Sequence, residues 1–293
     1  MKLKHVLLHI NSGKNTPLDF VETITTMVEK EKGKCTVYES GNRKLPEADK
    51  ASRRKHLEAD KPDLAIVLGG DGTMLQAAEF LRGMSIPLLG INFGFLGFIT
   101  ALEAGVLKKH LHRVLNGEFL VSERNTLDIT IHRNRGRTVR GWALNEALLT
   151  RADNPHLITA TATVGGQLLT DYRADGILVA TPTGSTAYSL AAGGPIISPK
   201  CNVITITPIC PHALSNRSVV AEADEIIEIV LQNRSGDAQV QADGRTLGKV
   251  NHGDRVMINK SPIPALLAFM PEINFYNIVR SKLGWNGDGK WTK

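Results

Sequence analysis

Cysteines and aromatic residues are scarce in this sequence, and long apolar runs are absent. Among 293 residues there are three cysteines, and aromatic residues make up 5% of the chain. The cysteines, at positions 35, 201 and 210, lack the spacing of a metal site, so we expect a reducing, cytoplasmic location. No apolar run approaches the length of a membrane span, so no membrane association is expected. Apolar residues still make up 42% of the chain, enough for a globular core.

Acidic residues are outnumbered by basic ones, which gives a formal net charge of +6. The basic residues cluster at 52–55, 108–109 and 132–137. Clusters of this kind can bind nucleic acid, but the shortage of aromatic residues and the lack of a known reader motif argue against such a partner. The expected consequence of the charge is attraction of small anionic molecules.

The Gly-x-Gly-x-x-Gly fingerprint of dinucleotide-dependent dehydrogenases is also absent after the first predicted strand. A different glycine turn, Gly-Gly-Asp-Gly at 69–72, follows the apolar run 65–68 and precedes a helical pattern. Such a turn can cradle a phosphate, because its backbone N–H groups are free and its glycines allow close approach. Asp71 would repel phosphate, so it is expected to accept a proton or hold a metal ion. The alternative is that Asp71 only caps the helix.

The first part of the chain has the pattern of an α/β domain. Apolar segments at 5–10, 35–38, 65–68 and 86–91 predict strands, and helical spacing appears after residue 18 and over 104–115. Strands separated by helices predict a parallel, Rossmann-like sheet over residues 1–122.

From residue 123 to 264 the pattern changes to short runs in which apolar and polar residues alternate. Runs such as 127–131, 158–164 and 226–231, joined by turn dipeptides, predict an antiparallel β domain. Helical spacing returns at 273–283, so residues 265–293 are expected to form a tail that packs back on the first domain.

Two polar pairs in the β domain are candidate binding residues. Asn145 and Glu146 interrupt the apolar strand 142–149, where they must be hydrogen-bonded or cost several kcal/mol. The alternative is a β-bulge or an edge position. Arg173 and Asp175 precede another apolar strand, and they could instead pair with each other.

The stretch 181–195 is rich in glycine and in small hydroxyl-bearing residues. It offers hydroxyl and N–H groups with little bulk, and Tyr188 adds a flat ring and a phenol. These are the groups that a nucleotide needs for its hydroxyls and its base, so we favour a ligand wall over a plain loop.

Taken together, these motifs resemble those of the NAD kinases in order and spacing. The matching segments are 69–72, 145–146, 173–176 and 181–189, supported by 90–98, 211–215 and 281–285. The Gly-Gly-Asp-Gly turn alone is not specific, because lipid kinases and phosphofructokinases carry similar turns. The resemblance covers nearly the whole chain. It implies an N-terminal α/β domain, a C-terminal β-sandwich that binds NAD, and a chain end that returns to the first domain.

The resemblance also implies a reaction: transfer of a phosphate to the 2′-hydroxyl of the adenosine ribose of NAD, giving NADP. The donor would be ATP or polyphosphate, with a divalent cation, Mg²⁺ or Mn²⁺. A Walker-type lysine is absent, so positioning and the cation must stabilise the charge. Family members are cytoplasmic homodimers or homotetramers. The donor, the acceptance of NADH, the oligomeric state, feedback by NADP or NADPH and the metal ligands all stay open at this point.

The resemblance assigns roles by position. Asp71 would take the 2′-hydroxyl proton, Gly72 would lie beside it, and Gly69 and Gly70 would line the phosphates. The residues expected to contact NAD are Asp71, Gly72, Asn145, Glu146, His156, Arg173, Asp175, Thr186, Ala187, Tyr188, Ser189, Leu190, Ala191 and Arg245.

Three other functions compete with this one. A lipid kinase of the diacylglycerol kinase type shares the glycine turn but has no need of the 181–189 wall. A non-catalytic NAD(P)-binding regulator has no need of Asp71. A dehydrogenase is disfavoured by the missing fingerprint.

Overall fold

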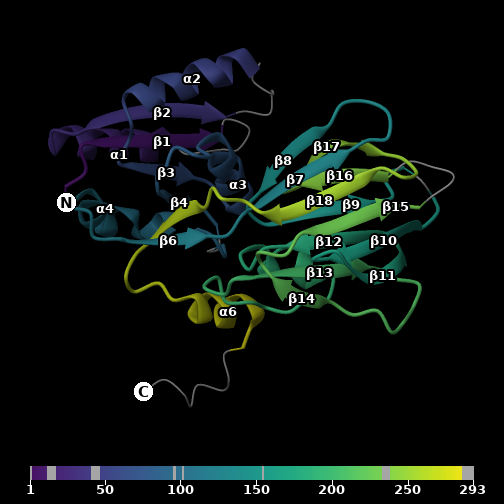
Figure 1. Cartoon of the computed structure of the whole chain (residues 1–293). Coiled ribbons are helices and arrows are strands. Elements are labelled where there is room, and N and C mark those ends of the chain that lie inside the picture. Colours follow the sequence, from purple (N-terminus) through teal and green to yellow (C-terminus); the bar gives the residue numbers. More distant parts are fainter. Residues whose placement is uncertain are drawn as a thin grey trace. The chain divides into compact units, whose positions relative to one another are not determined.

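The chain divides into two compact units in the computed structural model (Figure 1). The structure describes residues 2–11, 18–40, 47–94, 97–100, 102–153, 155–232 and 238–285. The first unit comprises Met1–Glu123 together with Ala265–Lys293, and the second comprises Arg124–Pro264. Residues 265–285, the last described part of the chain, therefore belong to the first unit.

The first unit is built on a sheet whose strand order is β2-β1-β3-β4-β19-β6, with β5 paired to β4. The pairs β1–β2, β1–β3, β3–β4, β4–β5 and β4–β19 are parallel. The strands are β1 (His5–Asn11), β2 (Lys34–Ser40), β3 (Leu64–Leu68), β4 (Leu88–Asn92), β5 (Leu102–Glu103), β6 (Leu120–Arg124) and β19 (Ala265–Phe269). β1 and β3 are buried along their whole length, as expected of central strands in a parallel sheet.

The helices of the first unit are α1 (Leu18–Lys30), α2 (Glu47–Ala59), α3 (Asp71–Phe80), α4 (Leu107–Leu115), preceded by a short 3-10 turn (Ala104–Val106), and α6 (Phe275–Leu283). The sequence did not predict α2, because its residues are nearly all polar and Leu57 is its buried apolar anchor. Arg54 of α2 donates to the carbonyls of Phe80 and Arg82 (2.8 Å to Arg82). A polar helix can thus be held by contacts that leave no hydrophobic period in the sequence.

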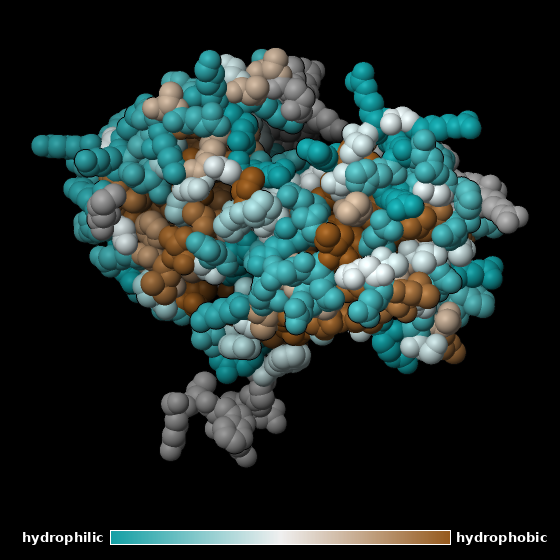
Figure 2. All heavy atoms as spheres, in the orientation of Figure 1, coloured by the Kyte–Doolittle hydropathy of each residue, from teal (hydrophilic) through white to brown (hydrophobic). Residues whose placement is uncertain are grey.

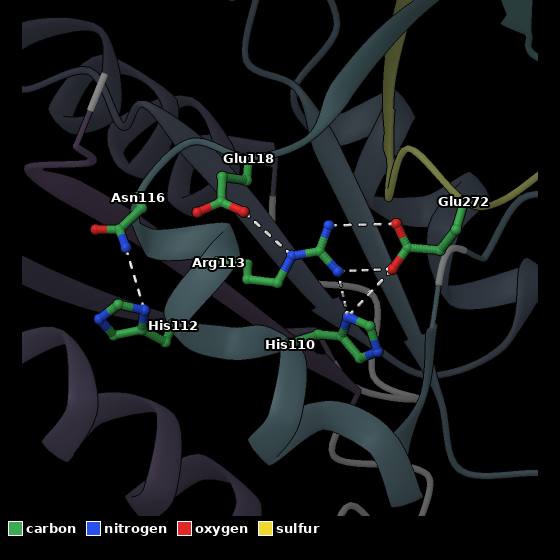
Figure 3. A network of polar contacts seen from close by, with 6 residues as sticks. All are labelled: His110, His112, Arg113, Asn116, Glu118 and Glu272. Atoms are coloured by element: carbon green, nitrogen blue, oxygen red, sulfur yellow. Dashed lines mark hydrogen bonds and ion pairs between the residues drawn. The ribbon is translucent and has the colours of Figure 1, made fainter.

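An ion-pair network holds the segment that follows β19 against α4 (Figure 3). The Arg113 guanidinium donates to both carboxylate oxygens of Glu272, at 2.8 and 3.3 Å, and its Nε donates to Glu118 at 3.1 Å. His110 Nδ1 lies 3.5 Å from Glu272 Oε1. Two parallel N–H···O bonds give the Arg113–Glu272 pair a fixed geometry.

The second unit contains two antiparallel sheets, with strand orders β11-β10-β15-β18-β7-β8 and β14-β13-β12-β9-β16-β17. Their strands are β7 (Leu127–His132), β8 (Val139–Ala143), β9 (Glu146–Thr150), β10 (Ile158–Val164), β11 (Gln167–Ala174), β12 (Gly176–Ala180), β13 (Val203–Ile209), β14 (Val219–Glu222), β15 (Ile227–Leu231), β16 (Ala238–Ala242), β17 (Arg245–Val250) and β18 (Arg255–Lys260). One hydrophobic cluster takes residues from both sheets, such as Ile129 and Ile229 from one and Val179 and Val240 from the other. Shared burial between facing sheets makes this unit a β-sandwich.

Hydrophilic residues cover most of the face seen in Figure 2, and hydrophobic residues show between them in separate patches. Among the residues that the structure describes, the most exposed large apolar side chains are Leu214 (88%), Leu168 (68%), Tyr276 (61%) and Leu120 (60%). Across the described ranges, no helix combines the length and the apolar character needed to cross a membrane.

His9, in the middle of β1, is a buried titratable group. Its side chain is fully buried, and neither ring nitrogen has a hydrogen-bond partner among the described residues. Its ring stacks on that of Tyr38, with 5.1 Å between ring centroids, and Tyr38 stacks on Phe80 at 4.1 Å. Burial lowers the pKa of His9 to about 4, so the ring is neutral in the folded protein near neutral pH.

This burial predicts an acid sensitivity of the first unit. Below pH ~6.5 the unfolded chain binds a proton at His9 that the folded chain binds only near pH 4. The free energy of unfolding should therefore decrease as the pH is lowered through this window, by about 2 kcal/mol from pH 7.5 to pH 5. Urea unfolding at the two pH values measures this loss. His9→Phe should remove that share of the loss, whereas the exposed His56→Phe should keep it. Equal pH dependence in His9→Phe and the parent would contradict the assignment.

Candidate active site

The Gly-Gly-Asp-Gly turn joins the buried strand β3 to helix α3. Gly69 has φ +151°, and a Cβ at this position would lie 2.8 Å from Thr73 Cβ, so glycine is required here. The Gly69 N–H donates to the Ile91 carbonyl of β4 (2.9 Å). The Gly70 carbonyl accepts from the N–H groups of Thr73 and Met74 and so begins the first helical turn. The first residue of α3 is therefore Asp71, at a fixed place beyond the end of β3.

Asp71 does not cap α3. The cap position is Gly70, without a side-chain hydrogen bond, so the capping alternative is wrong. The Asp71 carboxylate instead accepts from the N–H of Phe98 (3.0 Å) and, more weakly, from that of Ile99 (3.4 Å). Asp71 is partly exposed, and a Cβ at the next residue, Gly72, would meet nothing within 4 Å. A carboxylate that is held in place and partly exposed can receive a proton from a bound hydroxyl.

In the second unit, the polar interruption predicted at Asn145 and Glu146 is a break between β8 and β9. The alternative of an edge position is wrong, because β9 lies between β12 and β16. The Asp243 carboxylate accepts from the N–H groups of Leu144 (2.8 Å), Asn145 (2.8 Å) and Glu146 (3.1 Å). One side chain thus satisfies three consecutive backbone donors that lack a strand partner.

The carbonyl groups of the same break are satisfied from the end of β12. Thr181 donates its N–H to the Asn145 carbonyl (2.9 Å) and its hydroxyl to the Leu144 carbonyl (2.7 Å). Gly184 packs on this backbone, and a Cβ there would lie 2.8 Å from Asn145 Cα. The break is held on both sides, so Asn145 and Glu146 are presented by a rigid backbone.

The side chains of Asn145 and Glu146 keep unused polar atoms. Both residues are buried, at 7% and 9% exposure, and Asn145 Oδ1 and Glu146 Oε2 have no hydrogen-bond partner among the described residues. A buried polar atom without a partner costs about 1–3 kcal/mol, which a ligand that bonds to it would recover. Burial raises the pKa of Glu146 to about 8, and the nearby Asp243 carboxylate raises it in the same direction.

Replacing Glu146 with glutamine should stabilise the free protein at alkaline pH. As the pH rises from about 4.5 to 8, the unfolded chain releases the Glu146 proton and the folded chain keeps it, so the free energy of unfolding falls. Glu146→Gln lacks this loss and should gain about 2–5 kcal/mol over the parent between pH 5 and pH 8.5 in urea unfolding. Glu228→Gln, at a partly exposed residue paired with Arg255, serves as the control. An unchanged pH dependence in Glu146→Gln would contradict the raised pKa.

Arg173 and Asp175 do not pair with each other. Asp175 forms an ion pair with Arg151 (3.0 Å), and Arg173 is exposed on β11. In the β9–β12 ladder Gly176 pairs with Thr150 at one end and Ala180 pairs with Glu146 at the other. Asp175 lies five residues from the position paired with Glu146, or about 17 Å along the strand, so the structure does not bring it to Glu146.

The other two predicted contacts lie on loop and strand ends of the second unit. His156 is exposed on the segment before β10. Arg245 begins β17 and donates to the Trp142 carbonyl of β8 (3.1 Å), which places it on the Asp243 side of the break.

The stretch after β12 folds into a 3-10 turn (Gly184–Thr186) and a short helix α5 (Tyr188–Ala191), so it is not a plain loop. Some of its hydroxyls serve the fold: Ser185 Oγ donates to the Pro182 carbonyl (2.7 Å), and Ser189 Oγ is buried 3.5 Å from Thr207 Oγ1. Among residues 181–191, those that reach the surface are Thr186, Ala187, Tyr188, Leu190 and Ala191. Tyr188 is 45% exposed and offers its ring.

Sequence reasoning missed Asp243 and Arg151 as partners of the predicted residues, and it placed Thr181 in the 181–189 stretch without its bonds to Leu144 and Asn145. Asp243 and Gly244 have φ +47° and +75° and form the turn between β16 and β17. In the sequence an Asp-Gly pair predicts such a turn and nothing more. The described part of the chain holds no group of three or more His, Cys, Asp or Glu side chains placed to bind a metal ion.

Comparisons with known proteins agree with this architecture. A family model described as the ATP-NAD kinase N-terminal domain matches residues 9–119, and one described as the ATP-NAD kinase C-terminal domain matches residues 144–268. NAD kinase from Symbiobacterium thermophilum is 41% identical over 221 residues, which cover 75% of this chain and 78% of that protein. NAD kinase from Photobacterium profundum is 42% identical over 228 residues, which cover 78% of each.

Solved structures confirm the fold class, an α/β domain followed by a β-sandwich. Yeast NADH kinase complexed with NADH has a TM-score of 0.83 at 24% identity, and the match covers 100% of this chain and 91% of that one. An NAD kinase from Archaeoglobus fulgidus in complex with ATP has a TM-score of 0.74 at 22% identity, covering 95% and 98% of the two chains.

Proposed function

This chain belongs to the NAD kinase family and phosphorylates NAD to NADP, and from that premise we propose that Asp71 is its general base. The observation that carries the proposal is the partly exposed Asp71 carboxylate, held at the glycine turn by the backbone N–H groups of Phe98 and Ile99. In this role Asp71 takes the proton of the 2′-hydroxyl of the adenosine ribose as the oxygen attacks the terminal phosphorus of the donor. The bond from that phosphorus to the bridging oxygen breaks, and with ATP the leaving group is ADP.

Asn145 and Glu146 bind the adenosine end of NAD in this proposal. Their buried Oδ1 and Oε2 atoms lack partners among the described residues, and their backbone is fixed by Asp243 and Thr181. Because the pKa of Glu146 is raised to about 8, its carboxyl group holds a proton near neutral pH. It can then donate one hydrogen bond to NAD as well as accept others.

The phosphate donor is ATP in this proposal, with its phosphates at Gly69, Gly70 and the start of α3. No side chain caps the start of α3, and the positive end of the helix dipole lies there, so this position favours an anion. A divalent cation, Mg²⁺ or Mn²⁺, fits beside Asp71, because Mg²⁺ commonly binds one or two carboxylates together with substrate phosphates. When bound, the cation would neutralise charge on the transferred phosphate.

The remaining contacts line the rest of NAD in the same proposal. Tyr188 supplies its half-exposed ring, with the other surface residues of 186–191 around it and Ser189 buried behind them. His156, Arg173, Asp175 and Arg245 are the polar contacts expected from the family motifs. A homodimer or homotetramer is proposed as the assembly. The exposed Leu214 and Val220, the latter on the edge strand β14, supply apolar surface for it.

Purified protein with NAD, Mg²⁺ and either ATP or polyphosphate, followed with an NADP-specific dehydrogenase, tests this proposal. NADP should form with ATP, and the comparison of donors shows whether polyphosphate also serves. NAD binding without NADP from either donor would favour the non-catalytic regulator instead. Absence of NAD binding would contradict the assignment of the 145–146 and 181–191 segments.

A further inference from the structure

The turn 97–100 packs unusually close to β4 and α3. The Gly97 N–H donates to the Thr100 hydroxyl (2.7 Å), and Thr100 is fully buried. Gly90 of β4 lies beneath this turn: a Cβ there would lie 3.0 Å from Thr100 Cα and 2.7 Å from Met74 Sδ of α3. The missing side chain at Gly90 therefore lets the turn approach the beginning of α3, where Asp71 stands.

Gly97 is the point at which this turn meets Asp71. A Cβ at Gly97 would collide with Asp71 Oδ1 and lie 2.6 Å from Cγ and 2.8 Å from Oδ2. The three nearest atoms thus all belong to one carboxyl group. The next two residues, Phe98 and Ile99, donate their N–H groups to the same carboxylate. The backbone of 97–99 encloses the carboxylate and leaves room for a hydrogen atom at position 97 but for no methyl group.

We propose that Gly97 is a positioning residue for phosphoryl transfer, whose missing side chain lets the 97–99 backbone hold the Asp71 carboxylate in the orientation that receives the 2′-hydroxyl proton. This inference rests on the proposed role of Asp71. Cβ contacts shorter than 3.0 Å do not persist in proteins, so a methyl group at position 97 must displace the carboxylate and loosen its two N–H bonds. A misplacement of about 1 Å in a catalytic group can lower the rate about 10²-fold.

Gly97→Ala tests the inference, with Gly94→Ala as the matched control. Neither glycine has a positive φ, so alanine suits both backbones. A Cβ at Gly94 would meet nothing within 4 Å. We expect Gly97→Ala to lower kcat about 10²-fold with the KM for NAD and for ATP within about threefold. Gly94→Ala should keep the parent kcat. Parent kcat in Gly97→Ala would overturn the inference.

A double-mutant cycle with Asp71→Ala shows whether Gly97 acts through the carboxylate. Alanine at position 71 removes the three atoms that a methyl at 97 would meet first. Added to Asp71→Ala, Gly97→Ala should lower the residual kcat less than about threefold and leave Tm unchanged, whereas in the parent it lowers both. Equal losses in the two backgrounds would overturn the inference.

The outcomes for the base and for the glycine are separable. Parent-like turnover in Asp71→Ala would remove the proposed base, whatever Gly97→Ala does. A large loss in Asp71→Ala with none in Gly97→Ala would keep the base and refute the role of Gly97. The Tm part of the cycle reads the contact between the two residues without any activity.

Discussion

Asp71→Asn should lower kcat about 10²–10⁴-fold while the Kd for NAD stays within a few-fold of the parent value. Asparagine has nearly the same size, and its carbonyl oxygen can still accept the N–H of Phe98. It cannot take the proton of the attacking hydroxyl, so the loss falls on the chemical step and spares binding. Initial rates of NADP formation, with NAD binding measured by calorimetry, check both parts.

Asp63→Asn is the matched control for this change. Asp63 lies in the same unit just before β3, and its carboxylate also accepts two backbone N–H groups, from Lys4 (2.7 Å) and His5 (2.9 Å). Asp63→Asn removes the same charge from a similar setting, but at the opposite end of β3 from the glycine turn. Its kcat should therefore stay near the parent value. Near-parent turnover in Asp71→Asn would contradict the role of general base.

Asp243→Ala should weaken NAD binding about 10²-fold and lower the free energy of unfolding by about 3–5 kcal/mol. The substitution leaves the backbone N–H groups of Leu144, Asn145 and Glu146 without their shared acceptor. The break between β8 and β9 then loses the contact that fixes Asn145 and Glu146. Calorimetric NAD titration and urea unfolding measure the two effects.

If Asp243→Ala folds poorly, two further variants still test the prediction. Asp243→Asn retains one carbonyl oxygen for two of the three N–H groups, and it should weaken NAD binding about tenfold in a folded protein. Asp254→Asn is the control for stability. Asp254 is a buried carboxylate of the same unit that accepts from the N–H groups of Asn134 (2.8 Å) and Asn251 (2.9 Å). Asp254→Asn should lower the free energy of unfolding without changing the affinity for NAD. Equal NAD affinity in Asp243→Asn and the parent would contradict the positioning role.

The fold class could be predicted because burial leaves a period in the sequence. β3 reads as a continuous apolar run, and β7 and β10 alternate apolar and polar residues, as their environments require. Helix α2 could not be predicted in this way. Its polar residues face solvent, and it is held through Leu57 and the Arg54 side chain, neither of which forms a repeating pattern.

The candidate site could be predicted where a polar residue interrupts an apolar strand, because burying such a residue costs free energy unless it is hydrogen-bonded. Asn145 and Glu146 stood out because two polar residues in an apolar strand need partners. Their partner Asp243 lies almost a hundred residues away, and its position before Gly244 already has a sufficient local explanation as a turn. In the sequence, Gly97 is one of several glycines in a glycine-rich loop. Only its proximity to Asp71 in the structure shows why a methyl group does not fit at this position.

The central claim is that chemistry depends on Asp71 in the first unit, whereas NAD recognition depends on the break that Asp243 holds in the second. The most direct test is calorimetric titration of NAD into folded Asp71→Asn and Asp243→Asn under identical conditions. The account predicts a Kd near the parent value for Asp71→Asn and one about tenfold higher for Asp243→Asn. Equal affinities in the two variants, or weaker binding in Asp71→Asn, would contradict this division of roles.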